Sequence, residues 1–366
     1  MKVSFILLCI TIIIITVFIF KKFIFKSKHK FWSQQPVSRN HVTKEGIISK
    51  NPKFNVILPE NMFFKELDVQ NHKDISNLHT FINNHYSDTY QYSKNFLSET
   101  LNYLDSSRCC NVALYKDNDI IGFIHNKPVV LSISNKIQEF YYTDFLCMHK
   151  NYRNNNLATF LISKMISRHE NNVPFIFKKE TKNLPFNFIN KTSYYYLLLD
   201  NKNYRNNRIT HNIQFMNANN IEKIYNFICT IETKAKIHQK LSFIEFKKLY
   251  SNSCKKVLVE FDKSGNIISV LIYITIYIKN SNKLDQSIDI EHIYIDNSNY
   301  NYEIVDHLIN IALNQNIIII SCLNQSYNKY FITKYDMKPS LDIYFHAYNY
   351  HINSKIDSFD MCFNFL

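Results

Sequence analysis

The stretch that decides the fold runs from Phe145 to Ala158 and reads FLCMHKNYRNNNLA. Its apolar start predicts the end of a β-strand, the polar run after His149 predicts a turn, and apolar residues at helical spacing follow from Leu157. Free backbone amides at the start of such a helix, aided by the helix dipole, bind pyrophosphate groups. A polar turn that binds no ligand explains such a pattern more often, so the stretch alone leaves both interpretations open.

The two halves of the chain show similar successions of expected strands and helices. In the first half the hairpin signal KDND separates two apolar strands, and a third strand leads into a helix whose apolar residues share one face. In the second half DKSGN gives another hairpin signal, followed by a helix and an apolar strand. The expected elements are Asn111–Tyr115, Ile120–Ile124, Phe140–Met148, a helix face of Leu157, Phe160, Leu161, Met165 and Ile166, Lys256–Phe261, Ile267–Tyr277, a helix Glu303–Asn314 and a strand Ile317–Cys322. The repetition predicts an α+β protein of two related domains joined near Asn206.

Length and composition agree with a folded chain of this size. A chain of 366 residues is long enough for two domains with their own cores, and 46% hydrophobic residues argue against extended disorder. Glycine occurs only at Gly46, Gly122 and Gly265, so turns that need a left-handed backbone must use Asn or another residue. The eight cysteines include no CxxC pair, and we interpret them as reduced thiols, with no metal site.

The first residues of the chain read as a membrane segment. Val3–Phe20 is apolar except for one Ser and two Thr, which is close to the lower limit of about 17–25 residues for a spanning helix. Lys21 and Lys22 follow directly, without the small residues of a signal-peptide cleavage site. We therefore expect one uncleaved transmembrane helix at residues 1–22.

The positive charge fits this interpretation better than it fits nucleic-acid binding. The net charge is +13, but the lysines are spread along the chain and no nucleic-acid-binding motif occurs. The one dense cluster, Lys21, Lys22, Lys26, Lys28 and Lys30, follows the apolar segment and suits anionic lipid. By the positive-inside rule, the rest of the protein should face the cytoplasm from a membrane anchor.

Four motifs occur in one order along the chain. They are KFWSQQPV at 30–37, YQYSKNFL at 90–97, IGFI at 121–124 followed by Pro128, and the stretch quoted above. In this order they resemble the motifs K-F-W-x-T-Q-P-V, F-x-Y-S-x-E-F-L, V-G-F-I-x-x-x-P and N-F-L-C-V-H-K-x-L-R-S-K-R-L-A of the N-myristoyltransferase (glycylpeptide N-tetradecanoyltransferase) family. Weaker matches are Val259-Glu260, Ser321-Cys322-Leu323 and Tyr348-Asn349-Tyr350, so the resemblance covers nearly everything after Lys28.

The resemblance implies a fold of two tandem acetyltransferase-like (GNAT) domains in pseudo-twofold arrangement, preceded here by the transmembrane helix. The turn with Arg153, Asn156 and Ala158 also resembles the Q/R-x-x-G-x-G/A loop of the acetyltransferase-like fold. The implied organisation is an anchor at 1–22, a basic arm contacting CoA at 23–51, an acyl-CoA-binding domain at 52–205 and a domain completing the peptide groove at 206–366. We expect a monomer that binds no nucleic acid.

The implied reaction is transfer of a myristoyl group from myristoyl-CoA, a substrate and not a resident cofactor, to the N-terminal glycine of proteins. The amine attacks the thioester directly. Backbone amides of Phe145 and Leu146 would form the oxyanion hole, and the terminal carboxylate of Leu366 would take a proton from the glycine ammonium. The acyl-CoA contacts implied are His29, Lys30, Phe31, Trp32, Phe145, Leu146, Cys147, Met148, Arg153, Asn154, Asn156, Leu157 and Ala158. The peptide contacts implied are Tyr86, Tyr90, Tyr194 and Tyr196. Trp32 is the sole tryptophan, on a polar arm with no evident core to join.

The chain departs from the family pattern mainly where the peptide would bind. Asn154-Asn155-Asn156 replaces Ser-Lys-Arg, which removes two cations near the CoA phosphates. Lys178-Lys179-Glu180-Thr181 replaces Y-T-A-G, Tyr194–Tyr196 lacks the family's His, and the acidic loop after Tyr86 is reduced to little more than Asp88. An alternative is therefore a degenerate homologue that binds acyl-CoA or N-terminal peptides without turnover. Transfer of another acyl chain, or acylation of Lys, is a further alternative.

The assignment of the base to Leu366 predicts a distinctive mutational pattern. Leu366→Met should be mild, because it keeps an apolar side chain and the terminal charge. Deleting Leu366, or adding residues after it, displaces the carboxylate by about 3.3–3.6 Å per residue and should slow the chemical step on the order of a hundredfold. Myristoyl-CoA binding should stay unchanged. Full turnover by a C-terminally extended protein would exclude this base.

Overall fold

A computed structural model describes residues 31–363, except 53, 103–106, 170–171, 181–183, 200–211, 252–253, 281–282, 297–302 and 354. Several predictions fall outside this range: the anchor at 1–22, the CoA contacts of His29 and Lys30, the domain boundary near residue 206 and the terminal carboxylate of Leu366. Within the described range, no helix combines the length and apolar character needed to span a bilayer.

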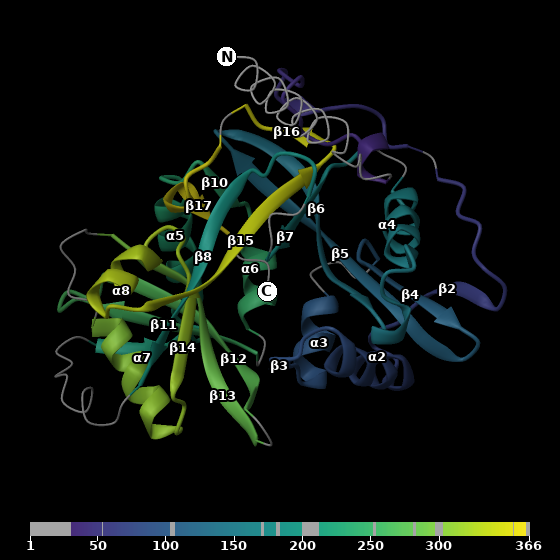
Figure 1. Cartoon of the computed structure of the whole chain (residues 1–366). Helices are drawn as coiled ribbons and strands as arrows, with labels where there is room; N and C mark the ends of the chain where they lie inside the picture. Colours follow the sequence, from purple (N-terminus) through teal and green to yellow (C-terminus); the bar gives the residue numbers. More distant parts are fainter. Residues whose placement is uncertain are drawn as a thin grey trace, which may run out of the picture.

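One mixed β-sheet runs through both halves of the chain (Figure 1). Its strands are, in spatial order, β17 (Met361–Cys362), β10 (Ile237–Gln239), β5 (Asp119–Ile133), β6 (Lys136–Met148), β7 (Phe175–Lys179), β15 (Lys338–Tyr348), β8 (Asn190–Leu198), β14 (Ile319–Leu323), β13 (Lys283–Ile295), β12 (Ile267–Asn280), β11 (Lys255–Phe261) and β9 (Asn212–Phe215). Strand β4 (Cys110–Lys116) also pairs with β5, β2 (Met62–Glu66) pairs with β4, and β3 (Tyr90–Gln91) pairs with β12. A separate pair joins β1 (Gly46–Ile47) to β16 (Tyr350–His351).

The two halves exchange strands at the centre of this sheet. Strand β8 comes from the first half but pairs with β14 of the second, and β15 comes from the second half but pairs with β7 of the first. The exchanged strands also pair with each other. The junction between the halves is therefore continuous hydrogen-bonded sheet.

Helices cover both faces of the sheet in each half (Figure 1). Alternate residues of β4 and β5 pack on α4 (Leu157–Ser167) on one face, and on α2 (His72–His85) and α3 (Lys94–Leu101) on the other. In the second half α7 (Glu303–Asn314) and α8 (Asn328–Lys334) pack on one face, opposite α5 (Ile221–Glu232) and α6 (Phe243–Tyr250). Alternation of apolar side chains across each strand produces this three-layer arrangement. The predicted α+β class is confirmed.

The predicted elements are present, but the strands predicted at Ile120–Ile124 and Phe140–Met148 are longer, spanning Asp119–Ile133 and Lys136–Met148. Both hairpins form, as β4–β5 and β11–β12, and helix α7 spans the predicted Glu303–Asn314. The strand predicted from Ile317 begins instead at Ile319. The cause is the end of α7, where Asn316 has a left-handed backbone and the amide of Ile317 bonds to the carbonyl of Ala312 rather than to a neighbouring strand.

Asparagine does replace glycine at left-handed turns, as the composition predicted. Asn154 and Asn156 have φ values of 68° and 59° in the turn before α4, and Asn349 has 57° after β15. Asn tolerates this region better than most residues. The turn that precedes α4 is thus built without glycine.

Gly122 is required for another reason, the close approach of α4 to the sheet. A Cβ atom at this position would lie 2.8 Å from both Leu161 Cδ1 and Met148 Sδ. Both distances are too short for the present packing, so the side chains of Leu161 and Met148 would have to shift if residue 122 carried a Cβ atom.

Gly122→Ala should therefore destabilise the protein by about 1–3 kcal/mol, measured by urea unfolding. Leu161→Val trims the nearest neighbour, so the double variant should lose less stability than the sum of the two single variants. Additive losses would contradict the close-packing explanation.

Candidate active site

A β-bulge at Phe145 and Leu146 is the centre of the site. Strand β6 pairs Cys147 with Phe123 and Asp144 with His125, so Phe145 and Leu146 together oppose one residue of β5. Phe145 has a φ of 52°, and its ring is buried beside Tyr86 and Tyr92. A bulky residue in left-handed backbone is strained, and bulges of this kind recur beside active sites.

A cavity of about 390 Å³ opens where β6 and β7 part. These parallel strands pair only through Tyr141–Thr143 and Phe175–Phe177. The lining is largely apolar, and its polar side chains gather near the bulge. Apolar lining residues are Phe31, Trp32, Ile124, Leu146, Ala158, Ile162, Met165, Ile166, Phe175, Phe177 and Leu184, and polar ones include Thr143, Asp144, Lys178 and Lys179. This volume and lining suit an apolar ligand held by a few polar contacts.

Trp32 does join a core, contrary to our expectation. It is 9% exposed, its ring stacks on Phe177 with centroids 6.3 Å apart, and it packs against Phe186 at 5.1 Å. The arm folds back onto β15, where the Tyr348 hydroxyl donates to the side-chain oxygen of Gln35 over 3.1 Å. Because the arm folds back in this way, the Trp32 indole forms part of the cavity wall.

The turn before α4 presents its helix N-terminus toward the same cavity, which Ala158 and Thr159 line. Asn156 caps the helix without a side-chain hydrogen bond, and among the first amides of α4 that of Thr159 donates to the Asn156 carbonyl at 3.1 Å. The amides of Leu157 and Ala158 precede the first intrahelical hydrogen bonds. Arg153 does not extend toward the cavity. Its guanidinium donates to the backbone carbonyls of His85 and Met148 and so fastens the turn to α2.

Asp144, which the sequence analysis overlooked, is the most connected polar side chain in the cavity. One carboxylate oxygen accepts from the Tyr86 hydroxyl at 3.1 Å and from the Phe145 amide at 2.7 Å. The other accepts from the Tyr142 hydroxyl at 2.9 Å and lies 3.9 Å from Lys178 Nζ. Burial, and then the Asp144 charge, raise the pKa of Tyr86 and Tyr142 well above the usual value, so both phenols stay protonated.

Cys147 is not a nucleophile in this arrangement. The side chain is 4% exposed, and burial raises the pKa of its thiol to about 12. A thiol with this pKa is protonated at neutral pH and unreactive. The site therefore does not favour an acyl-enzyme intermediate on Cys147.

Of the predicted peptide-contact tyrosines, Tyr86 bonds to Asp144, while Tyr90 and Tyr194 lie near a second carboxyl group, that of Asp289. Tyr90 lies in β3 opposite Ile278, and Tyr194 lies in β8 opposite Leu323. After burial, the largest influence on the pKa of both hydroxyls is the charge of Asp289, which raises it. Asp289 accepts from Ser321 at 2.8 Å, and its burial raises the pKa of this carboxyl to about 7. Tyr196 follows Tyr194 on the same face of β8.

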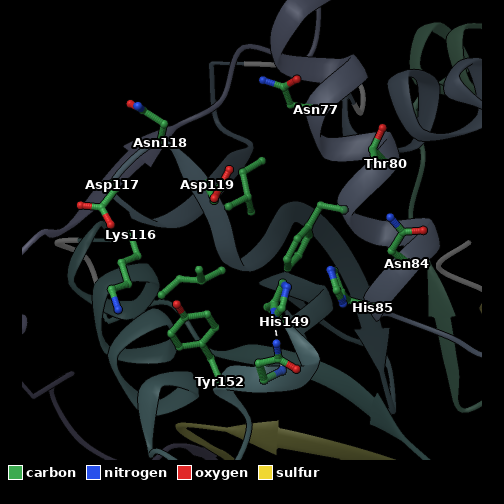
Figure 2. A pocket seen from close by; sticks show the side chains of 14 residues that line it. Asn77, Thr80, Asn84, His85, Lys116, Asp117, Asn118, Asp119, His149 and Tyr152 are labelled. Atoms are coloured by element: carbon green, nitrogen blue, oxygen red, sulfur yellow. Dashed lines mark hydrogen bonds between the residues drawn. The ribbon is translucent and has the colours of Figure 1, made fainter.

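A second cavity, of about 550 Å³, lies between α2 and the β4–β5 turn (Figure 2). His85 and His149 face each other in it, with ring centroids 4.0 Å apart. Burial, followed by the neighbouring His149, lowers the pKa of His85. The remaining lining is mostly amide and charged side chains, including Lys116, Asp117 and Asp119, which does not suit an acyl chain.

The sequence is similar to known N-myristoyltransferases. Residues 41–179 match the family model described as Myristoyl-CoA:protein N-myristoyltransferase, N-terminal domain. A putative glycylpeptide N-tetradecanoyltransferase of Amsacta moorei entomopoxvirus is 25% identical over 307 residues, covering 79% of this chain and 93% of the relative. Glycylpeptide N-tetradecanoyltransferase 2 of Danio rerio is 29% identical over 159 residues, and this match spans 39% of the chain and only 32% of that relative.

The solved structures decide the fold. Saccharomyces cerevisiae N-myristoyltransferase with bound myristoyl-CoA superposes with a TM-score of 0.78 at 17% identity, covering 91% of this chain and 94% of that one. The fold is that of an N-myristoyltransferase. A GCN5-related glucosamine N-acetyltransferase region of a fungal enzyme matches with a TM-score of 0.52 at 11% identity, covering 81% of this chain and 39% of that one, in line with the acetyltransferase-like architecture expected.

Within this N-myristoyltransferase fold, the structure brings five of the residues that the motifs indicated to one cavity. Phe31, Trp32, Leu146 and Ala158 line one cavity with Tyr86. Cys147 and Leu157 are buried behind it, while Asn154 is exposed. His29, Lys30 and Leu366 lie outside the described residues, so their roles stay predictions. Asp144 could have been noticed as the one carboxylate in the otherwise apolar and aromatic run from Phe140 to Met148.

Proposed function

We propose that this protein transfers a myristoyl group from myristoyl-CoA to the N-terminal glycine of proteins. The observation that carries the proposal is the apolar cavity between β6 and β7, which ends at the bulge of Phe145 and Leu146. It lies in a fold whose solved counterpart holds myristoyl-CoA. The acyl chain would lie against Ile162, Met165 and Trp32, and the CoA pyrophosphate against the first amides of α4.

The bulge would stabilise the developing oxyanion. A bulge frees backbone amides from the strand ladder, and amides aimed at the thioester oxygen stabilise the charge that forms there during attack. We propose the amides of Phe145 and Leu146 for this role. The Phe145 amide now donates to Asp144, so the thioester oxygen must share or replace that acceptor.

The peptide would enter on the other side of the bulge, between the first and second halves. Tyr86, Tyr90 and Tyr194 would contact it, with Tyr196 further along β8. Two acidic side chains beside these tyrosines, the half-buried Asp144 and the buried Asp289, make this region suited to a cationic amine. The family's Y-T-A-G segment is replaced here by Lys178–Thr181, so peptide preference should differ from that of relatives.

The proposal predicts acyl transfer from labelled myristoyl-CoA to peptides beginning with Gly, and none to the same peptides N-acetylated or beginning with Pro. Ile162→Glu, which places a charge in the cavity, should weaken myristoyl-CoA binding at least about tenfold, since a charge in an apolar pocket is costly. Lys164→Gln, on the exposed face of the same helix, should not.

Two outcomes would redirect the proposal. Tight myristoyl-CoA binding with no transfer to any peptide would favour the degenerate homologue, which binds without turnover. Faster transfer from a shorter or longer acyl-CoA, or transfer to Lys side chains, would change the substrate and keep the reaction type. A panel of acyl-CoA lengths against Gly- and Lys-containing peptides separates these cases.

We further propose that residues 1–22 anchor the protein in a membrane, with the catalytic part in the cytoplasm. The support is the apolar run Val3–Phe20 and the lysine cluster after it. The full chain should sediment with membranes and resist high-salt extraction, whereas a protein lacking residues 1–22 should be released. Release of the full chain by salt alone would contradict the anchor. Protection of the catalytic part from protease in sealed vesicles whose cytoplasmic face points outward would contradict the topology.

A further inference from the structure

The chain enters the described fold beside the acyl cavity. Phe31 is the first described residue, and it lines that cavity together with Trp32 and Tyr348. Residues 21–30 connect Phe31 to the apolar run Val3–Phe20, which we propose as the membrane anchor. Ten extended residues reach at most about 35 Å, so an anchored chain holds Phe31 within that distance of the bilayer. The short connection therefore limits which end of the molecule can meet the membrane.

Three segments meet beside β16 at this end of the molecule (Figure 1), and we call them the docking surface. They are residues 44–50, 134–137 and 234–236. The first contains β1, which pairs with β16 just beyond Tyr348 in the chain. The second is the tip of the β5–β6 hairpin, where Lys136 Nζ lies 3.2 Å from a carboxylate oxygen of Glu45. The third leads into β10, and its Lys236 carbonyl accepts from the Ser134 amide at 2.8 Å.

The docking surface is positively charged. It contains five lysines and one acidic residue, Glu45. Lys136 pairs with Glu45, while Lys236 pairs with Asp360 at 2.6 Å and also lies near Asp357. The other three lysines are exposed and have no ion-pair partner in the part of the chain that the structure describes: Lys44, Lys50 and Lys234. Exposed lysines close to a bilayer are attracted to anionic lipid headgroups.

Two isoleucines project from the same surface. Ile47 on β1 is 47% exposed, and Ile137 near the start of β6 is 68% exposed. Single exposed apolar side chains are common on protein surfaces and need no explanation by themselves. Apolar side chains set among lysines are, however, typical of surfaces that lie in the headgroup region of a membrane. The combination with the short connection to the anchor is what gives these two residues a meaning.

We propose that the docking surface lies on an anionic bilayer, with Ile47 and Ile137 in the headgroup region and the unpaired lysines against lipid headgroups. A lipid surface is the occupant because the ten-residue connection brings this end of the fold to the bilayer that holds the anchor. The inference rests on the proposed anchor. It does not depend on acyl transfer.

Docking in this way would place the acyl cavity beside the membrane. Phe31 lines the cavity and directly follows the connection to the anchor, and Tyr348 lines it just before β16. A long acyl chain partitions into lipid, whether it is carried by CoA or by a peptide. The orientation would therefore bring the source of the acyl donor and the destination of the acylated product to the same end of the protein. This consequence, unlike the docking itself, rests on the proposed transfer reaction.

The test measures whether an added tryptophan meets lipid in the full chain bound to vesicles of phosphatidylcholine and phosphatidylserine with brominated acyl chains. Ile137→Trp places the probe on the docking surface. Leu284→Trp, the matched control, replaces a side chain that is 50% exposed on β13, at the opposite end of the molecule (Figure 1). The emission of Trp32 is measured in the wild type and subtracted. Bromine should quench at least about half of the emission added at position 137 and less than about a tenth of that added at 284, since a docked side chain lies about 5–10 Å into the headgroup boundary.

A charge reversal tests the lysines. Lys44→Glu with Lys50→Glu, added to the Ile137→Trp protein, should reduce the quenching at least about twofold, because anionic lipid repels the new carboxylates. Lys263→Glu with Lys283→Glu changes the net charge equally on exposed positions of the second half and should leave the quenching unchanged. Salt at about 1 M should act as the first pair does, since it screens the lysines, while the anchor keeps the protein on the vesicles.

Several outcomes would overturn the inference. Equal quenching at positions 137 and 284, or quenching at neither, in a protein that sediments with the vesicles would leave the anchor standing and contradict the docking. An acidic protein partner for the lysines would then be the alternative. Equal effects of the two charge reversals would contradict the role of the lysines. A full chain that does not sediment with vesicles would overturn anchor and docking together. Acyl transfer to Gly peptides is assayed separately in detergent, so failure of the proposed reaction is distinguished from failure of this inference.

Discussion

The site depends on one slip in strand register. Opposite a single residue of β5, strand β6 carries both Phe145 and Leu146, and from that point it no longer follows β7. The bulge turns Phe145 into left-handed backbone and buries its ring between α2 and the sheet. The pairing of β6 with β7 ends at Thr143, just before the bulge, and the cavity opens there. The same distortion therefore creates the space for an acyl chain and frees amides at its end.

The rest of the molecule holds this distortion in place. Helix α4 packs closely over Gly122, and the arm carrying Trp32 closes the cavity from outside. The exchange of β8 and β15 between the halves makes the sheet continuous, which places Asp289 of the second half near Tyr90 and Tyr194 of the first. Strained backbone persists only where surrounding structure over-determines it. Here that surrounding structure includes residues from both halves of the chain.

Sequence reasoning succeeded where the signal is local. Hairpins with Asp, Asn and Gly turns, the amphipathic face of α4 and the bounds of α7 follow from short-range patterns, and Asn at φ values near 60° follows from the scarcity of glycine. Motif resemblance located the cavity wall at Trp32 and Leu146. It failed where partners are distant in the chain. Trp32 meets Phe177 and Phe186 only because the arm folds back, and Asp144 meets Tyr86 across 58 positions. No local pattern marks the bulge, because a bulge is defined by the strand opposite it.

The central claim is that the thioester lies at the Phe145–Leu146 bulge with its acyl chain between β6 and β7. A crystal structure with a non-hydrolysable ketone analogue of myristoyl-CoA tests it most directly. The account predicts the ketone oxygen within about 3.1 Å of the Phe145 or Leu146 amide nitrogen, and the alkyl chain against Ile162 and Met165. An analogue found in the polar cavity between His85 and His149, or one whose carbonyl meets neither amide, would contradict it.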